Sequence, residues 1–272
     1  MEKRNDHYRK KNNTRYNDKR DARSPEEEVE NGAVVGRNAV RELLKSGRDI
    51  DKIFVQKGER EGSIVALVAE AVERKIPVIE SEKAKLDSLS LGAPHQGIVA
   101  MAAMKEYSSV YDILRIAEER GEKPLIVVLD CVVDPYNFGS IIRCAEGVGA
   151  HGIIIPKRRA VGVTPTVTKA SAGAIEHMAI AKVSNLVNTL EGLKKKGIWT
   201  FAAEAGGKAH YEADFNVGAA IVFGSEENGI SRLLLEKCDF VVSIPMYGKV
   251  NSFNVSTAAA VILSEAVKQQ RN

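Results

Sequence analysis

Short apolar runs alternate with amphipathic stretches in the part of the chain that follows its charged start. Four of the runs have the length and composition of β-strands: residues 33–35, 52–56, 76–79 and 97–104. The stretches between them show helical spacing: residues 38–47, 62–75 and 81–90. Asn38 and Gly47 suit the two ends of the first helix. Strands and helices in turn predict a small α/β domain, which we place at residues 31–105.

The remainder of the chain repeats this alternation with more apolar elements. Residues 107–124 predict a linking helix, because one helical face carries Val110, Ile113, Leu114 and Ala117. The run LIVVLD at 125–130 is apolar enough for a central parallel strand. Further strand candidates are 152–155, 177–183, 198–203, 219–224 and 240–245. The longest predicted helix is 254–270, and we place a second α/β domain at residues 106–272.

Composition and charge point to a globular protein with a basic arm. A hydrophobic content of 44% is sufficient for a core, and the apolar runs are too short to span a bilayer. Residues 1–23 carry nine Lys/Arg against four Asp/Glu and lack the apolar stretch of a secretory signal. We therefore expect residues 1–30 to form a disordered basic arm, which either contacts nucleic-acid phosphates or is simply solvated.

Cysteine and histidine spacing gives no metal-binding pattern. Cys131, Cys144 and Cys238 are scattered, and the five histidines show no ligand spacing. The sequence therefore predicts no metal site, and a reduced, cytoplasmic setting fits best.

The first stretch with candidate chemistry is LDCVVDPYNFGSIIRCAEGVGAHG, residues 129–152. A strand ends, a polar loop follows, and a helix is expected to begin near Phe138. The apolar stripe of that helix consists of Phe138, Ile141, Ile142 and Ala145. Arg143 is turned roughly 140° from Phe138 at about 100° per residue, so it leaves the buried face. It points either to solvent or into a cleft, and its position alone favours solvent.

The same stretch contains a misleading glycine pattern. Gly147, Gly149 and Gly152 spell G-x-G-x-x-G, which binds dinucleotides only where it follows a strand and opens a helix. Here the glycines follow a helix and precede a strand. We interpret Gly147 and Gly149 as helix-ending residues with positive φ and reject a nicotinamide site.

Two further stretches place glycine and polar groups after a strand and before a helix. In AAIVFGSEENGIS, residues 219–231, Gly224 permits close approach to the backbone and Glu226 stands where ligands bind in open α/β sheets. In IPMYGKVNSFNVSTAAAVILSE, residues 244–265, Ser252 or Asn254 caps the following helix. Capping needs one such residue and the loop supplies several, so this loop is expected to line a ligand pocket. Alone, each stretch also fits an ordinary strand–turn–helix connection.

In order and spacing, the three stretches together resemble the three motifs of the SpoU (TrmH-like) RNA ribose 2′-O-methyltransferases. The segments VVGRNAVRELL and PHQGIVA resemble the substrate-binding domain of the branch that acts on ribosomal RNA. The resemblance runs from about Gly32 to the C-terminus. It implies an α/β fold with a knotted C-terminal methyltransferase domain, a parallel sheet threaded as a deep trefoil. It also implies an N-terminal RNA-binding domain similar to ribosomal-protein-like modules, and a homodimer.

The resemblance also implies S-adenosylmethionine as the cofactor and a set of site residues. The catalytic residues are Asn137, Arg143, Glu226, Ser252 and Asn254. The knot is expected to hold the cofactor through Gly224, Ile244, Met246, Gly248, Ser252 and Phe253. The family usually has leucine where this chain has Phe253, and we expect this apolar change to reshape the adenine pocket. Because arginine stays protonated, Arg143 is expected to hold the target phosphate and stabilise the developing 2′-oxyanion.

The implied substrate is RNA, and the expected target is a guanosine ribose of 23S ribosomal RNA. A transfer RNA target and a non-catalytic RNA-binding role in ribosome assembly are the alternatives; the joint presence of the five catalytic residues counts against the second. The segment PKRRA, residues 156–160, is a candidate RNA contact on the larger domain, or else a solvated loop.

Overall fold

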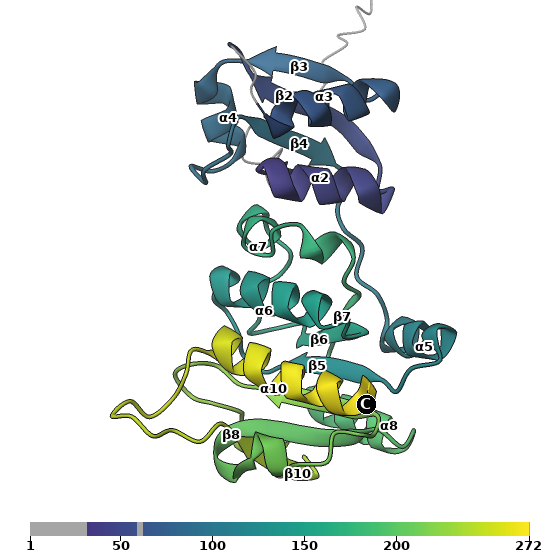
Figure 1. The fold of residues 1–272 in the computed structure, drawn as a ribbon, viewed down its shortest axis with the longest axis vertical. Helices are drawn as coiled ribbons and strands as arrows, with labels where there is room; N and C mark the ends of the chain where they lie inside the picture. Colours follow the sequence, from purple (N-terminus) through teal and green to yellow (C-terminus); the bar gives the residue numbers. More distant parts are fainter. Residues whose placement is uncertain (1–31, 59–61, 272) are drawn as a thin grey trace, which may run out of the picture.

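Two α/β domains lie end to end along the long axis of the molecule (Figure 1). The computed structural model describes residues 32–58 and 62–271, so the predicted arm at residues 1–30 lies outside the described residues. Within the described part of the chain, no helix is both long and apolar enough to cross a membrane.

The N-terminal domain contains a four-stranded mixed sheet with the order β1-β4-β2-β3. The strands are β1 (Ala33–Val35), β2 (Ile50–Gln56), β3 (Val78–Ser81) and β4 (Ile98–Ala102). One face of the sheet packs against α2 (Arg37–Ser46) and α3 (Ser63–Glu73), and the other against α4 (Lys83–Leu89). Alternate residues of β4 enter the two cores, as a strand covered on both faces requires.

The first helix of this domain begins earlier than the sequence predicts. Gly36, with φ of +98°, precedes α2, and Asn38 lies inside the helix, so its predicted capping role is wrong. The physical reason is that the Arg37 N–H finds an acceptor outside the helix, Gln96 Oε1 at 3.0 Å. Gly47 ends α2 with φ of +75°, as predicted.

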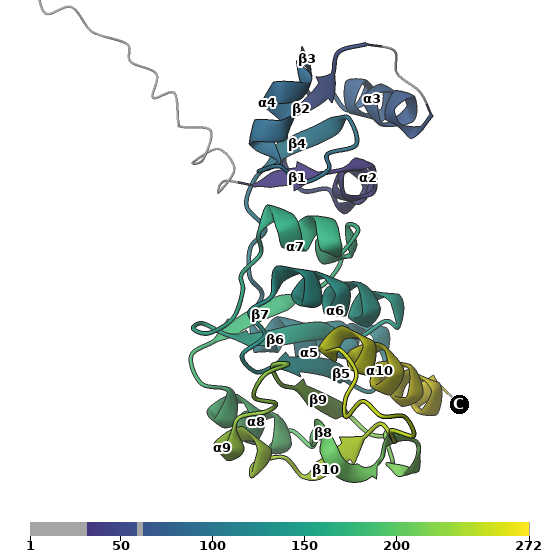
Figure 2. The same ribbon diagram turned by 90° about the vertical axis from the view of Figure 1, so that its left-hand side faces the viewer.

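The C-terminal domain contains a six-stranded sheet with the order β10-β8-β9-β5-β6-β7. All of its strand pairs are parallel, which confirms the predicted parallel sheet. The strands are β5 (Leu125–Leu129), β6 (Gly152–Pro156), β7 (Ile180–Val183), β8 (Trp199–Ala209), β9 (Ala219–Phe223) and β10 (Phe240–Ser243). The central strand β5 is fully buried, because helices cover both faces of the sheet (Figure 2).

Helices on each face pack against alternate residues of β5. One face carries α6 (Pro135–Gly147), α7 (Pro165–Ala170) and α10 (Val255–Arg271), and the other carries α5 (Val110–Arg120), α8 (Leu186–Lys194) and α9 (Arg232–Leu235). Two short 3₁₀ turns complete the domain: η1 (Ala174–Glu176) and η2 (His210–Glu212). The linking helix α5 buries Ile113 and Ala117 against the C-terminal domain, so the chain enters that domain through a packed helix.

The glycines of the misleading fingerprint separate into three roles. Gly149 has φ of +80°, as predicted for a helix end. Gly147 is the last residue of α6 and lacks a positive φ, so that part of the prediction is wrong; the helix runs one residue further, through the right-handed Val148. Gly152 lies under the linking helix, and an added Cβ would come within 2.5 Å of Ile113 Cγ1.

Candidate active site

The side chain of Asn254 joins the three motif stretches. Its Nδ2 donates to Asn137 Oδ1 at 2.9 Å and to Glu226 Oε1 at 2.5 Å. Its Oδ1 accepts from the Ser256 N–H at 2.9 Å and thereby caps α10. Because the cap needs the oxygen, the amide nitrogen must face the other two residues. One residue therefore fixes the start of a helix and the meeting point of three segments that are far apart in sequence.

Local chemistry places Asn137 beside that meeting point. Asp134 caps α6 by accepting from the Tyr136 N–H at 3.0 Å, and Pro135 occupies the first helical position. The helix therefore begins at Pro135 and not near Phe138, where the sequence predicts it. This early start puts Asn137 in the first turn, where its side chain is buried.

A cavity of about 630 Å³ opens at the carboxyl ends of β9 and β10, beside the middle of β8. Four chain segments form most of its wall: residues 203–205, 223–229, 242–244 and 251–255. Ligand sites of open parallel sheets lie at this end of the strands, and the volume falls within the range of small-molecule and cofactor sites. Glu226 and Asn254 both line the cavity, so the Asn254 hydrogen-bond network borders it directly.

Most, but not all, of the predicted cofactor residues line this cavity. Those that do are Gly224, Ile244, Met246, Ser252 and Phe253. Gly248 lies in the same loop but is not part of the wall, so its predicted contact with a ligand has no geometric support. The side chain of Ser252 is exposed and has no hydrogen-bond partner in residues 32–58 and 62–271, which leaves its hydroxyl available to a ligand.

Gly224, which lines the cavity, is also required for a reason that the sequence does not suggest. We expected it to admit a ligand, but an added Cβ would lie 2.0 Å from the carbonyl carbon of Gly229. The turn that follows is closed by paired backbone hydrogen bonds between Ser225 and Gly229, at 3.1 and 2.9 Å. Gly224 therefore lets this turn fold back onto the end of β9, which places Glu226 at the cavity.

Arg143 does not lie with the other predicted catalytic residues. Its side chain is exposed on α6, as its position relative to Phe138 favours, and it is not part of the cavity wall. Within the described residues it has no hydrogen-bond or ion-pair partner. The structure thus brings Asn137, Glu226 and Asn254 into contact, places Ser252 on the same wall, and leaves Arg143 facing solvent.

Two carboxylates, one just after β5 and one within β8, were missed by the sequence analysis. Glu204 lines the cavity and accepts from the Ile230 N–H at 3.0 Å. Asp130 is buried and accepts from the Ser231 N–H at 2.8 Å, which ties the end of β5 to the loop after β9. Asp130 is the first polar residue after β5, and Glu204 is the first charged residue of β8 after its apolar first half; a charge that directly follows an apolar run is the signal by which both can be found.

The thiols near the site are poor nucleophiles. Burial and the adjacent Asp130 raise the pKa of Cys131, and burial raises the pKa of Cys144. Burial, with the neighbouring Asp239 carboxylate, raises the pKa of Cys238 to about 12. Since the thiolate is the reactive form and these three cysteines lie outside the cavity wall, none of the three thiols is a candidate nucleophile. In the described part of the chain, no group of three or more His, Cys, Asp or Glu side chains is arranged to hold a metal ion.

Comparison with known proteins assigns a family to each domain. Residues 124–264 match the model of the SpoU rRNA Methylase family, and residues 33–108 match that of the RNA 2′-O ribose methyltransferase substrate binding domain. A putative TrmH family tRNA/rRNA methyltransferase of Bacillus subtilis, YacO, is 44% identical over 238 residues, covering 87% of this chain and 95% of the relative. One from Staphylococcus aureus (strain MSSA476) is 42% identical over 247 residues, covering 90% and 98%.

Solved structures agree with these matches. The SpoU methyltransferase AviRb of Streptomyces viridochromogenes, crystallised in complex with AdoMet, superposes with a TM-score of 0.72 at 26% identity, covering 88% of this chain and 90% of that chain. A putative RNA methyltransferase of the TrmH family from Porphyromonas gingivalis superposes with a TM-score of 0.67 at 26% identity, covering 86% and 88%.

Proposed function

The chain belongs to the SpoU rRNA methylase family and is an S-adenosylmethionine-dependent RNA methyltransferase, and we propose that its acceptor is a ribose 2′-hydroxyl. The observation that carries this proposal is the contact of Asn254 with both Asn137 and Glu226 at the edge of the cavity. Three motifs that meet beside a cavity of this size support one centre in which cofactor and ribose are held together.

The residues of the cavity fit S-adenosylmethionine. Phe223, Ile244 and Phe253 provide apolar wall for an adenine ring, and the Glu204 and Glu226 carboxylates complement a cationic ligand. When bound, this cofactor supplies an electrophilic methyl group on a sulfonium. We assign its binding to the cavity-lining residues Gly224, Ile244, Met246, Ser252 and Phe253.

The proposed chemistry is a direct displacement in which a bond from the ribose oxygen to the methyl carbon would form as the sulfur–methyl bond breaks; the sulfur would leave as a neutral thioether and the hydroxyl would lose its proton. Asn254 and Glu226 orient the ribose at the edge of the cavity, with Asn137 fixing the Asn254 amide from behind. Arg143 faces solvent outside the cavity wall, and we assign its guanidinium to binding the phosphate of the target nucleotide, which aligns the ribose at the cavity edge. The proton leaves through a phosphate oxygen or water, because arginine is a poor base.

We assign RNA binding to the N-terminal domain together with the loop at residues 157–159. Lys157, Arg158 and Arg159 are exposed at the carboxyl end of β6. The loop is tied to the first motif by a hydrogen bond from the Val161 N–H to Val132 O at 3.2 Å. Since β6 is the neighbour of β5, this basic loop follows Asn137 along the same rim of the sheet.

The finer assignments rest on family membership. We infer a 23S ribosomal RNA guanosine as the target, with transfer RNA as the alternative; the relatives are named tRNA/rRNA methyltransferases. We also infer a cytoplasmic homodimer with a trefoil knot around the cofactor site and an N-terminal domain like ribosomal-protein RNA-binding modules. Residues 223–229 and 251–255 both line the cavity and meet at the Asn254–Glu226 hydrogen bond, and the inferred knot would require such a meeting of the two segments.

The direct test is to incubate the protein with labelled S-adenosylmethionine and either ribosomal or transfer RNA, and to map the modified ribose. We expect a 2′-O-methyl group at one nucleotide of one RNA class. Binding of RNA without methyl transfer to either class would favour the ribosome-assembly alternative.

Arg143→Ala tests the assigned role of the arginine. We expect at least about a hundredfold loss of methyl transfer, because the phosphate contact that aligns the target ribose is removed. Cofactor affinity, measured by calorimetry, should be unchanged, since Arg143 lies outside the cavity wall. Arg120→Ala, which removes an exposed arginine from α5, is the matched control. Near-normal turnover of Arg143→Ala would refute the assignment.

A further inference from the structure

The two domains share no hydrophobic core. Among the described residues, the four buried apolar clusters each draw their members from one domain only. The domains meet where β1 and α2 contact α7 and η1 (Figure 2), and we call this surface the domain seam. Without shared apolar burial, relative motion of two linked domains is the default expectation. Whatever sets their orientation must therefore lie among the polar contacts of the seam.

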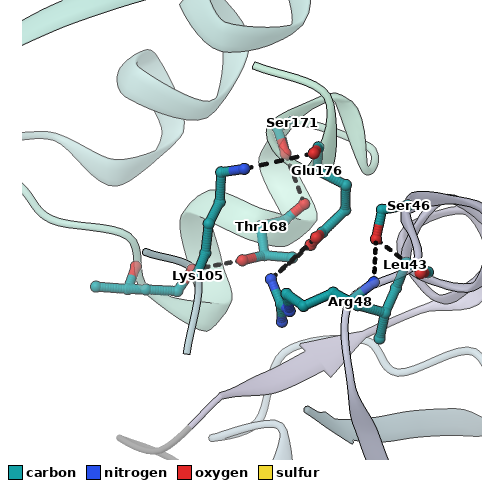
Figure 3. Close-up of polar contacts among 8 residues, drawn as sticks. Leu43, Ser46, Arg48, Lys105, Thr168, Ser171 and Glu176 are labelled. Atoms are coloured by element: carbon teal, nitrogen blue, oxygen red, sulfur yellow. Dashed lines mark hydrogen bonds and ion pairs between the residues drawn. The ribbon is translucent and has the colours of Figure 1, made fainter. Parts of the chain in front are cut away.

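The central polar contact of the domain seam is a buried ion pair between Arg48 and Glu176 (Figure 3). Arg48 Nη1 donates to both carboxylate oxygens of Glu176, at 3.0 and 2.9 Å. Only 1% of the Glu176 side chain and 16% of the Arg48 side chain are exposed. Arg48 belongs to the turn between α2 and β2, while Glu176 ends η1, so the pair joins one domain to the other.

A second cation, Lys105, also lies beside Glu176. Lys105, in the connection between the domains, directs its Nζ to the Glu176 carbonyl oxygen at 3.4 Å. Burial lowers the pKa of Lys105 and of Arg48, and the negative charge of Glu176 opposes both shifts. Burial raises the pKa of Glu176, against the charges of Arg48 and Lys105. The Glu176 carboxylate therefore accepts from the desolvated Arg48 and offsets the charge of the nearby Lys105, whose own hydrogen bond goes to the Glu176 carbonyl, so neutralising the carboxylate would weaken the compensation of both charges.

Close backbone packing fixes the position of the pair. Gly173 has φ of +94°, and an added Cβ would lie 2.7 Å from Glu42 Cβ of α2. The helix thus rests directly on the glycine that precedes η1. Beside this contact, His177 Nε2 and Glu42 Oε2 lie 3.0 Å apart. At the domain seam, the close contact between Gly173 and Glu42 is surrounded by polar groups. Such a contact fixes the orientation of one domain relative to the other without a shared apolar core.

We propose that Arg48 and Glu176 are positioning residues, which lock the N-terminal domain in a fixed orientation relative to the catalytic cavity. The proposal rests on the proposed function in one respect: the N-terminal domain must hold the RNA whose ribose enters the cavity. The pair touches neither cofactor nor ribose. It acts by keeping the RNA-binding surface of the N-terminal domain aligned with the cavity of the C-terminal domain. A small misalignment of the two would displace the target ribose from the cavity and slow methyl transfer.

Glu176→Gln tests the lock because glutamine has the same shape and no charge. We expect small-angle X-ray scattering of the whole protein to show a wider distribution of domain arrangements than the wild type. The KM for RNA should rise about tenfold through lost alignment, while the affinity for S-adenosylmethionine stays within about twofold. Glu119→Gln, which neutralises a carboxylate paired with Arg115 at 3.7 Å on the surface of α5, is the control and should behave as wild type.

Further variants distinguish a charge effect from a packing effect. Glu176→Asp keeps the charge and shortens the side chain, so it should disturb RNA affinity less than Glu176→Gln. Arg48→Gln should reproduce the Glu176→Gln phenotype from the other domain. Scattering identical to the wild type in Glu176→Gln, or a larger defect in Glu176→Asp, would overturn the proposal. Loss of cofactor binding in Glu176→Gln would also overturn it, by showing that Glu176 maintains the catalytic domain itself.

The scattering result does not depend on any RNA or methyl transfer. If the wild-type protein methylated no RNA but Glu176→Gln still loosened the domains, the proposed function would fail and the lock would stand.

Discussion

Asn254 shows how much of the candidate site depends on one side chain. The sequence predicts that the loop before the last helix carries more polar groups than capping requires, and Asn254 proves to use its oxygen for the cap and its nitrogen for the site. The family resemblance singled out Asn137 and Glu226 for this site without indicating that Asn254 joins them. Glu204 and Asp130 escaped notice, because their backbone acceptor roles depend on loops that are distant in sequence.

Replacing Asn254 separates its two roles. Asn254→Ser keeps an oxygen that can cap α10 but removes the amide that reaches Asn137 and Glu226. We expect both Asn254→Ser and Asn254→Ala to lose methyl transfer by at least about a hundredfold, since both lose the orienting contacts. Only Asn254→Ala should lose about 1 kcal/mol of unfolding free energy, measured by denaturant titration. Equal stability of the two variants would contradict the capping role. Retained methyl transfer in Asn254→Ser would contradict the role of the Asn254 amide in joining Asn137 and Glu226.

At the scale of elements, the strands of the parallel sheet were the most predictable features. Their apolar runs are buried on both faces, so the pattern is continuous and marks them clearly. Strand ends were less predictable: β8 extends to Ala209, beyond the predicted 198–203, because its second half leaves the core and becomes polar. The short α7 and η1 have no extended periodicity, so the sequence predicts no bounds for these two elements of the domain seam, unlike for β1 and α2.

The basic loop at residues 157–159 belongs to the same scale, since its position follows from β6. We expect Arg158→Ala combined with Arg159→Ala to weaken RNA binding and to reduce its logarithmic salt dependence by about one per lost phosphate contact. Binding isotherms over a range of salt concentrations measure both quantities. Lys195→Ala combined with Lys196→Ala removes the same charge from exposed positions just before β8, at the opposite end of the sheet. Equal effects of the two double variants would mean that only overall charge matters.

For the whole molecule, separate cores make the two domains separable units. Periodicity predicts two successive α/β regions, because each buries its own apolar faces. Their relative placement is beyond such patterns, since the Arg48–Glu176 pair joins residues 128 positions apart. The same limit applies to the knot, which the resemblance implies and no local pattern encodes.

This separation gives an expected outcome for a fragment of residues 106–272. No buried member of its two apolar clusters precedes Ile113, so the fragment should unfold cooperatively. Its affinity for S-adenosylmethionine should stay within about threefold of the full chain, because every cavity-lining residue is present. Methyl transfer to RNA should fall steeply without the N-terminal domain. Calorimetry and the labelling assay check the two parts, and loss of cofactor binding would show that the domains depend on each other.

The order in which the chain is made gives the Asn254 contact a further consequence. A ribosome translates the N-terminal domain first, then Asn137 and Glu226, and reaches Asn254 after both. A nascent or prematurely terminated polypeptide that stops before Asn254 contains the RNA-binding domain but lacks a complete methyl-transfer site. Such a product would act as a competitor, occupying the site on the transcript that the finished enzyme needs.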